Sequence, residues 1–132
     1  MTVLVGYVPS PLGEATLRAG VEESRRRSER LLVVNMSRDD VLVDAHRAAS
    51  DDLARVERDV IELGVDVEIV RIEKGSDPAD ALVRVADERD ASVVVIGLRH
   101  RTPVGKLIMG SAAQRILLDA RCPVLAVKEG TA

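Results

Sequence analysis

The chain has 132 residues, of which 46% are hydrophobic and 31% charged; this excludes a disordered chain and allows a proper core. Tyr7 is the only aromatic residue and Cys122 the only cysteine, which excludes base stacking on aromatic side chains, an intrachain disulfide and a thiolate metal cluster. The formal net charge of -3 argues against bulk nucleic-acid binding through phosphates.

The first half of the chain has the pattern strand, helix, strand, helix. Residues 3–8 form a continuous apolar run, which predicts a strand buried on both faces. Residues 12–27 have helical spacing, with Pro11 near the start, and residues 31–36 predict a second buried strand. Apolar residues then recur every three or four positions over residues 53–63, which predicts a helix that stops at the following glycine.

The second half continues the alternation. Residues 65–70 alternate apolar and acidic side chains, as expected of a half-exposed edge strand. The Ser-Asp-Pro sequence at residues 76–78 predicts the start of a third helix. Residues 93–96 predict a fourth strand, residues 111–120 a fourth helix and residues 123–127 a last strand.

This alternation predicts an α/β fold, a doubly wound parallel sheet of five strands with helices on both faces. We expect a single domain over residues 1–132. No apolar run reaches membrane-spanning length, and Met1 leads straight into a strand rather than a signal peptide. We therefore expect a cytoplasmic protein without a membrane or nucleic-acid partner.

The segment between the fourth strand and the fourth helix carries most of the functional information. Gly97 ends the strand, two residues separate it from His100, and nine more precede Gly110 and Ser111. A strand that leads through a glycine loop to a helix N-terminus presents backbone N–H groups and the positive end of the helix dipole, which suit an anion. Ser111 and Gln114 also match a capping box, which predicts Ser111 as the helix N-cap.

This spacing resembles the Gly-x2-Gly-x9-Gly-Ser/Thr signature of the universal stress protein family, with His100 in place of the second glycine. The resemblance covers essentially the whole chain and implies the strand order 3-2-1-4-5. It also implies a regulatory module that binds ATP or another adenine nucleotide at residues 97–111, and it leaves open whether Mg²⁺ accompanies the nucleotide. The nucleotide-binding residues expected on this basis are Tyr7, Val8, Gly97, Arg99, His100, Gly105, Gly110, Ser111 and Ala112.

The chain departs from the family pattern again after the first strand. Nucleotide-binding members usually carry an Asp there that faces the nucleoside, whereas this chain has Val8, which offers adenine an apolar wall and no hydrogen bond. Arg99, His100, Arg101 and Lys106 are either solvated loop charges or cations that replace part of the backbone phosphate cradle. The alternative to a nucleotide-binding module is therefore a scaffold of the same fold that acts only through protein contacts.

We expect no catalytic activity. The only histidines are His46 and His100, which leaves no basis for a Ser-His-Asp arrangement, and Lys106 is not followed by the hydroxyl residue of a Walker loop. His100 has no cysteine, second histidine or paired carboxylate at ligand spacing, so we expect no metal site. The sequence does not identify a client protein.

The last strand is predicted to mediate dimerisation. In the implied strand order it lies at a sheet edge, and an apolar edge strand tends to pair with another chain unless something covers it. We therefore expect an isologous homodimer. Its contact residues are Pro123, Val124, Leu125, Ala126 and Val127.

Overall fold

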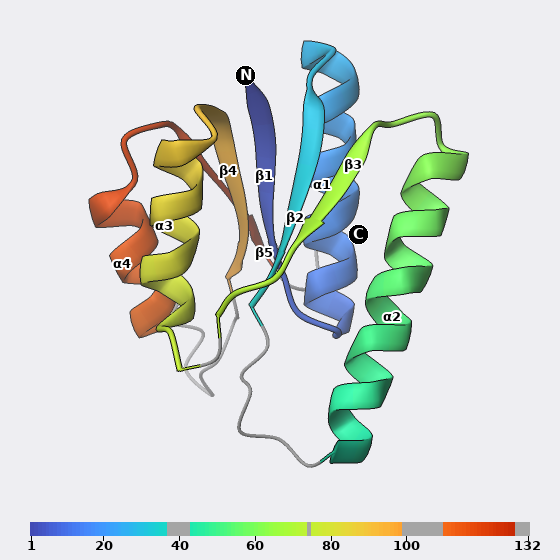
Figure 1. The fold of residues 1–132 in the computed structure, drawn as a ribbon. Helices are drawn as coiled ribbons and strands as arrows, with labels where there is room; N and C mark the ends of the chain where they lie inside the picture. The colour runs from blue at the N-terminus through green and yellow to red at the C-terminus, as the bar shows by residue number, and fades with distance from the viewer. Residues whose placement is uncertain (37–42, 74, 99–109, 129–132) are drawn as a thin grey trace.

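The computed structural model describes residues 1–36, 43–73, 75–98 and 110–128, and strands and helices alternate along this part of the chain (Figure 1). In chain order the elements are β1 (Thr2–Tyr7), α1 (Pro11–Arg27), β2 (Arg30–Asn35), α2 (Val43–Glu62), β3 (Val67–Val70), α3 (Pro78–Glu88), β4 (Ala91–Leu98), α4 (Ser111–Asp119) and β5 (Val124–Lys128). The helical spacing found from residue 53 onward marks only the second half of α2, which begins at Val43. Alanine-rich sequence before residue 53 favours helix without supplying large apolar residues at regular spacing.

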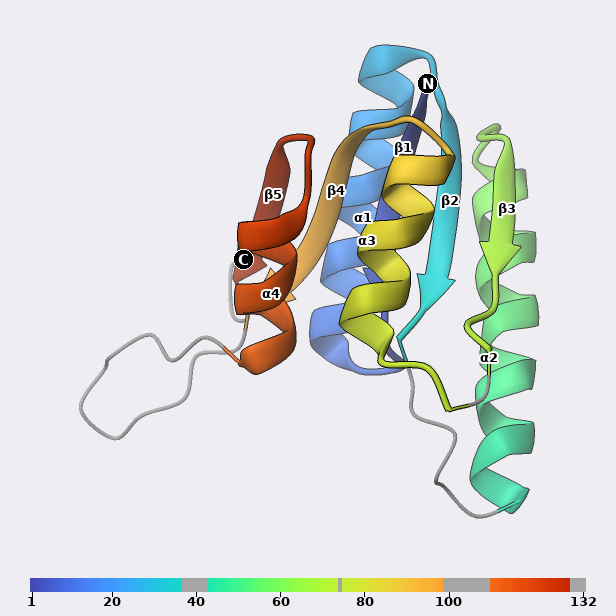
Figure 2. The ribbon, with the colours of Figure 1, turned by 60° about the vertical axis from the view of Figure 1, so that its left-hand side comes forward.

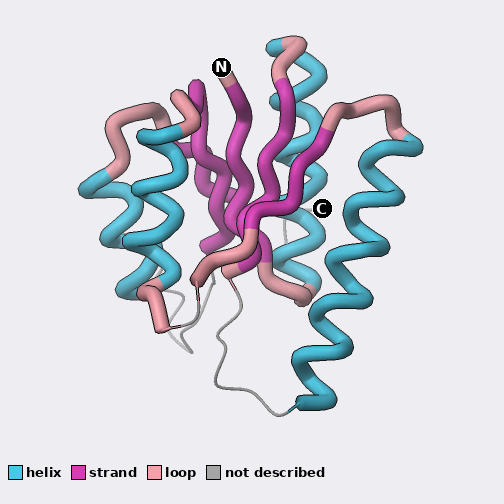
Figure 3. The backbone as a smooth tube through the Cα atoms, in the orientation of Figure 1, coloured by secondary structure: helices cyan, strands magenta, loops and turns pink. Residues whose placement is uncertain are grey.

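The strands of the described part form one parallel sheet in the order β3-β2-β1-β4-β5, which confirms the predicted fold class and strand order. Val5 of β1 lies opposite Val33 of β2 and Val95 of β4. The views in Figures 2 and 3 show α1 and α2 on one face of the sheet and α3 and α4 on the other. Among the described residues, no helix is both long and apolar enough to cross a membrane. The strand order reverses between β1 and β4, where ligands of such folds bind.

Two aliphatic layers pack on the opposite faces of the sheet, and β1 contributes to both. Val3, Val5 and Tyr7 belong to the layer under α1 and α2. Leu4, one position out of phase, belongs to the layer under α3 and α4. The helices add Leu17, Val21, Leu53, Val56 and Val60 to the first layer, and Ala79, Leu82, Ala86 and Ile116 to the second. The same alternation decides which residues at the end of β1 face the functional site.

The two edge strands carry different side chains. On β3, Glu68 forms ion pairs with Arg30 (3.0 Å) and Arg89 (2.5 Å), so charge marks this edge, as its alternating sequence predicts. On β5, Leu125 and Ala126 are exposed, and 38% of the Leu125 surface is accessible. The β5 edge is therefore the more apolar of the two.

Candidate functional site

A cavity of about 350 Å³ lies at the carboxyl ends of β1 and β4. The starts of α1, α3 and α4 close it, together with the residue that follows β2. Its volume is within the range of about 300–1,000 Å³ that small-molecule sites occupy. The lining residues are Gly6, Val8, Leu12, Gly13, Thr16, Met36, Asp77, Pro78, Ala79, Ile96, Gly97, Leu98, Gly110, Ser111, Ala112, Ala113, Arg115 and Ile116.

The N-terminus of α4 opens into this cavity without a side-chain cap. Gly110 is the N-cap residue, its backbone is extended (φ -66°, ψ 159°), and the structure of the described residues shows no side-chain hydrogen bond that caps the first turn. The predicted capping box is therefore wrong, because the helix begins one residue too early for Ser111 to act as its cap. Apart from its chain neighbours, a Cβ atom added at Gly110 would meet no atom of the described residues within 4 Å. Packing against the described residues therefore does not explain why this residue is glycine. The space that a side chain would occupy is open, and Gly110 lines the cavity.

Gly97 also lines the cavity, but packing explains why it is glycine. A Cβ atom there would lie 2.7 Å from both Leu12 Cγ and Thr16 Oγ1 of α1. Thr16 is buried, and its hydroxyl donates a hydrogen bond to the Leu12 carbonyl at 2.7 Å, so this wall has little freedom to move. Gly97 thus allows α1 to approach β4 closely.

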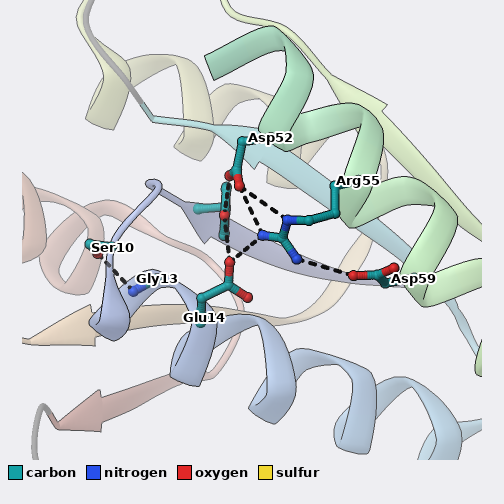
Figure 4. Close-up of polar contacts among 7 residues, drawn as sticks. Ser10, Gly13, Glu14, Asp52, Arg55 and Asp59 are labelled. Atoms are coloured by element: carbon teal, nitrogen blue, oxygen red, sulfur yellow. Dashed lines mark hydrogen bonds and ion pairs between the residues drawn. The ribbon is translucent and has the colours of Figure 1, made fainter. Parts of the chain in front are cut away.

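The turn between β1 and α1 forms an apolar wall of the cavity. Val8 lines the cavity, and its carbonyl oxygen lies only 1.7 Å from where a Cβ of Gly13 would be. Ser10 caps α1 by accepting a hydrogen bond from the Gly13 N–H at 3.0 Å (Figure 4). The turn is therefore closely packed, and Val8, Leu12 and Met36 give the cavity much of its apolar surface.

The carboxylate of the cavity comes from α3 rather than from the first loop. Asp77 Oδ1 accepts hydrogen bonds from the N–H groups of Ala79 (2.9 Å) and Asp80 (3.3 Å), which caps α3. Its other oxygen, Oδ2, is 3.1 Å from Nη1 of Arg115, and the same nitrogen is 3.1 Å from Asp80 Oδ1. In the sequence, Asp77 is recognisable only as part of a helix start, and Arg115 carries no signal of a role at the site. Their separation of 38 residues offered no local signal.

The Tyr7 side chain is not among the cavity-lining residues and points into the core layer under α1 and α2. It is fully buried under α1 and α2, and its hydroxyl donates to Glu14 (3.0 Å) or Asp52. Arg55 holds this cluster together through contacts with Glu14 Oε1 (2.5 Å), Asp52 Oδ1 (2.8 Å) and Asp59 Oδ2 (3.1 Å), as Figure 4 shows. The period of two along β1 signals this placement, because it groups Tyr7 with the inner residues Val3 and Val5 rather than with Val8.

The surroundings of this cluster shift the pKa values of Tyr7 and Asp52. Burial raises the pKa of Tyr7 well above its ordinary value, and hydrogen bonds to Asp52 and Glu14 raise it further. Burial opposes ionisation of Asp52, but hydrogen bonds from Tyr7 and Arg55 outweigh it and hold the pKa of that carboxyl below its usual value. These hydrogen bonds and ion pairs connect β1, α1 and α2.

Of the predicted site residues, Val8, Gly97, Gly110, Ser111 and Ala112 are brought together at the cavity, and Tyr7 is not. Arg99, His100 and Gly105 lie outside the described residues, so their roles stay predictions. Within the described ranges, no group of three or more His, Cys, Asp or Glu side chains is placed to hold a metal ion.

Comparisons with known proteins identify the family. A model of the universal stress protein family matches residues 1–128. A universal stress protein from Mycolicibacterium smegmatis is 46% identical over 126 residues, which cover 96% of both sequences. A universal stress protein structure from Archaeoglobus fulgidus has a TM-score of 0.79 at 32% identity and covers 96% of this chain and 97% of that chain. Another from the same organism, in complex with dAMP, has a TM-score of 0.73 at 27% identity and covers 96% of each chain. The chain belongs to the universal stress protein family.

Proposed function

We propose that this chain is a regulatory module that binds an adenine nucleotide, ATP foremost, in the cavity between β1, β4, α3 and α4. The observation that carries the proposal is the open space at Gly110, beside a helix N-terminus that no side chain of the described residues caps. Backbone N–H groups and the helix dipole make such a point attractive to phosphate. The Archaeoglobus fulgidus relative in complex with dAMP, itself an adenine nucleotide, supports this choice of ligand.

The cavity offers different surfaces to the two ends of a nucleotide. In our proposal the phosphate lies at the start of α4, against Gly110, Ser111 and Ala112. The base lies against the apolar wall that includes Val8 and Met36. Arg99, His100 and Gly105 complete the phosphate site, Gly97 lets α1 close it, and Tyr7 supports the end of β1 without touching the ligand.

We propose regulation rather than catalysis. The titratable side chains that line the cavity from the described part of the chain are Asp77 and Arg115. Asp77 caps α3, and both residues belong to one ion-paired group, which suits a structural task better than proton transfer. In this proposal, occupancy of the site is the signal.

The proposal is tested in two steps. Mass spectrometry of the protein as purified should detect co-purifying adenine nucleotide. Calorimetric titration with ATP, ADP, AMP and cyclic AMP, each with and without Mg²⁺, should then give a dissociation constant for at least one of them. If no nucleotide co-purifies and none binds at millimolar concentration, the protein is instead the scaffold that acts through protein contacts alone.

We also propose that the chain forms a homodimer through β5. The support is the exposed apolar edge, with Pro123, Leu125 and Ala126 exposed and Val124 and Val127 half-buried. A second copy pairing at this edge would remove the Leu125 side chain from water. Light scattering at tens of micromolar should give twice the chain mass, and Leu125→Asp should give the monomer mass. A wild-type monomer at that concentration contradicts this interface.

A further inference from the structure

Three charged side chains at and beside the cavity form a group that joins α3 and α4. Nη1 of Arg115, from α4, lies 3.1 Å from a carboxylate oxygen of Asp77 and 3.1 Å from one of Asp80, both from the start of α3. Figures 1 and 2 show α3 and α4 side by side on the same face of the sheet. Asp77 and Arg115 both line the cavity.

The two acidic residues are poorly placed for a cavity that receives an anion. Asp77 cannot turn away without leaving the α3 N-terminus uncapped, because its Oδ1 accepts two backbone N–H groups there. An uncompensated pair of carboxylates beside the start of α4 would repel phosphate. Arg115 leaves this group with one net negative charge instead of two.

We propose that Arg115 is a specificity-determining residue, which sets how strongly the cavity prefers ligands with more phosphate charge by shielding Asp77 and Asp80. This inference rests on the proposed nucleotide site and adds a mechanism to it. Arg115 shields the ligand from the two carboxylates through its charge and needs no contact with the ligand. The side chains are 46% exposed for Arg115, 51% for Asp77 and 61% for Asp80, so salt ions in the solvent can reach all three. The effect of the shielding must therefore scale with ligand charge and fall with added salt.

Arg115→Gln removes the shield and keeps a polar side chain of similar length. At low salt we expect weaker binding by about twofold to threefold for AMP and about fivefold to tenfold for ATP. Adenosine, which has no phosphate, should change by less than about twofold on the same argument. Raising the salt concentration to about 0.5 M should remove most of the difference between AMP and ATP.

Asp80→Asn distinguishes two possible roles of Arg115: shielding the ligand from the carboxylates, and only holding α3 and α4 together. This change removes a negative charge, leaves Asp77 and Arg115 paired, and should tighten ATP binding more than AMP binding. If Arg115 only held the helices together, both variants would loosen that tie and both would weaken every ligand, adenosine included. The sign of the Asp80→Asn effect therefore distinguishes the two roles.

Arg121→Gln is the matched control. Arg121 also pairs with an aspartate of α3, at 3.6 Å from Asp87 Oδ1, but at the opposite ends of α3 and α4 from the cavity. Arg121→Gln removes one positive charge and one ion pair, as Arg115→Gln does, and should leave the affinity for each nucleotide within about twofold of the wild-type value. Circular dichroism and urea unfolding of each variant show whether the fold is retained.

The outcomes are separable by calorimetry with adenosine, AMP and ATP. Charge-graded loss in Arg115→Gln, together with charge-graded gain in Asp80→Asn, supports the inference. Equal effects on AMP and ATP, or weaker ATP binding by Asp80→Asn, overturn the inference and leave the nucleotide site standing. Absence of AMP and ATP binding by the wild-type protein overturns the proposed function, and this inference falls with it.

Discussion

The helices α3 and α4 begin at the same cavity, yet their N-termini are satisfied in different ways. At α3, Asp77 accepts hydrogen bonds from two backbone N–H groups, and Pro78 in the first turn has no N–H to satisfy. At α4, Gly110 supplies no cap and leaves open space. The N-cap side chain of α3 accepts hydrogen bonds from its first turn, whereas the N-cap residue of α4 has no side chain that could do so. The missing side-chain cap is what suits the start of α4, rather than the start of α3, to the proposed phosphate.

The two helices also differ in how firmly the core holds them. α3 buries Ala79, Ala81, Leu82 and Ala86, whereas Ile116 is the buried residue of α4. Leu118 of α4 is 82% exposed. Few buried contacts and an uncapped end give a segment low local stability, and such segments respond most to a ligand. A nucleotide at Gly110 would therefore stabilise α4 more than α3.

The largest expected effect comes from giving α4 the cap that α3 has. Gly110→Asp places a carboxylate where the phosphate is proposed to lie, so AMP and ATP binding should weaken by about a hundredfold or more. An Asp cap is slightly better than a Gly cap, so the free energy of unfolding should rise by a few tenths of a kcal/mol. Calorimetry and urea unfolding measure the two quantities, which should move in opposite directions.

Gly110→Val is the uncharged partner of that experiment. It fills the same open space and should also abolish binding, while the poorer cap lowers stability by no more than about 1 kcal/mol. If either substitution leaves the ATP affinity unchanged, the ligand lies elsewhere and the comparison between the two helix starts loses its functional meaning.

Removing the cap from α3 should have the converse result. Asp77→Ala leaves two backbone N–H groups without their partner and should lower the free energy of unfolding by about 1–2 kcal/mol, while AMP binding is retained. Asp87→Ala, near the C-terminal end of the same helix, is the control, with a loss of less than about 0.5 kcal/mol expected for an exposed pair. Loss of AMP binding in a folded Asp77→Ala protein would give Asp77 a direct role in the site.

Much of the fold was predictable because its elements depend on local pattern. Apolar runs at 3–8 and 31–36 mark strands covered on both faces, and the Asp77-Pro78 sequence marks the start of α3 through capping that is encoded within a few residues. The start of α2 was missed, because its first half is helical by composition and has no apolar repeat.

The site was less predictable because it depends on distant segments. Arg115 meets Asp77 only after the sheet has brought α3 and α4 together, and no spacing rule encodes that contact. Ser111 matched a capping pattern, but the N-cap of α4 is Gly110, one residue earlier. Tyr7 does not line the cavity, and alternation along β1, which separates it from Val8, indicates this from the sequence.

Tyr7→Phe tests whether the far side of β1 is separate from the cavity. The change removes the hydroxyl that Glu14 and Asp52 accept from, so stability at neutral pH should fall by about 1–2 kcal/mol with no change in nucleotide affinity. Because the pKa of Asp52 is lower in the folded protein, its contribution is present above its unfolded-state pKa and is lost as pH falls through the folded value. Urea unfolding between neutral pH and about pH 3 should therefore show a smaller acid-induced loss in Tyr7→Phe than in wild type.

The smallest effect is expected at Ser111, where the two descriptions of the α4 start disagree. If Ser111 were the N-cap, Ser111→Ala would lower the free energy of unfolding by about 1 kcal/mol. Ser111 is instead exposed at the first helical position and caps nothing, so the loss should stay below about 0.5 kcal/mol. Ser111 lines the cavity, and if its hydroxyl donates to the proposed phosphate, ATP affinity should fall by about threefold through the lost hydrogen bond. A stability loss near 1 kcal/mol with unchanged affinity would mean that Ser111 closes α4 much as Asp77 closes α3. The contrast between the two helices would then lie in the Gly110 space alone.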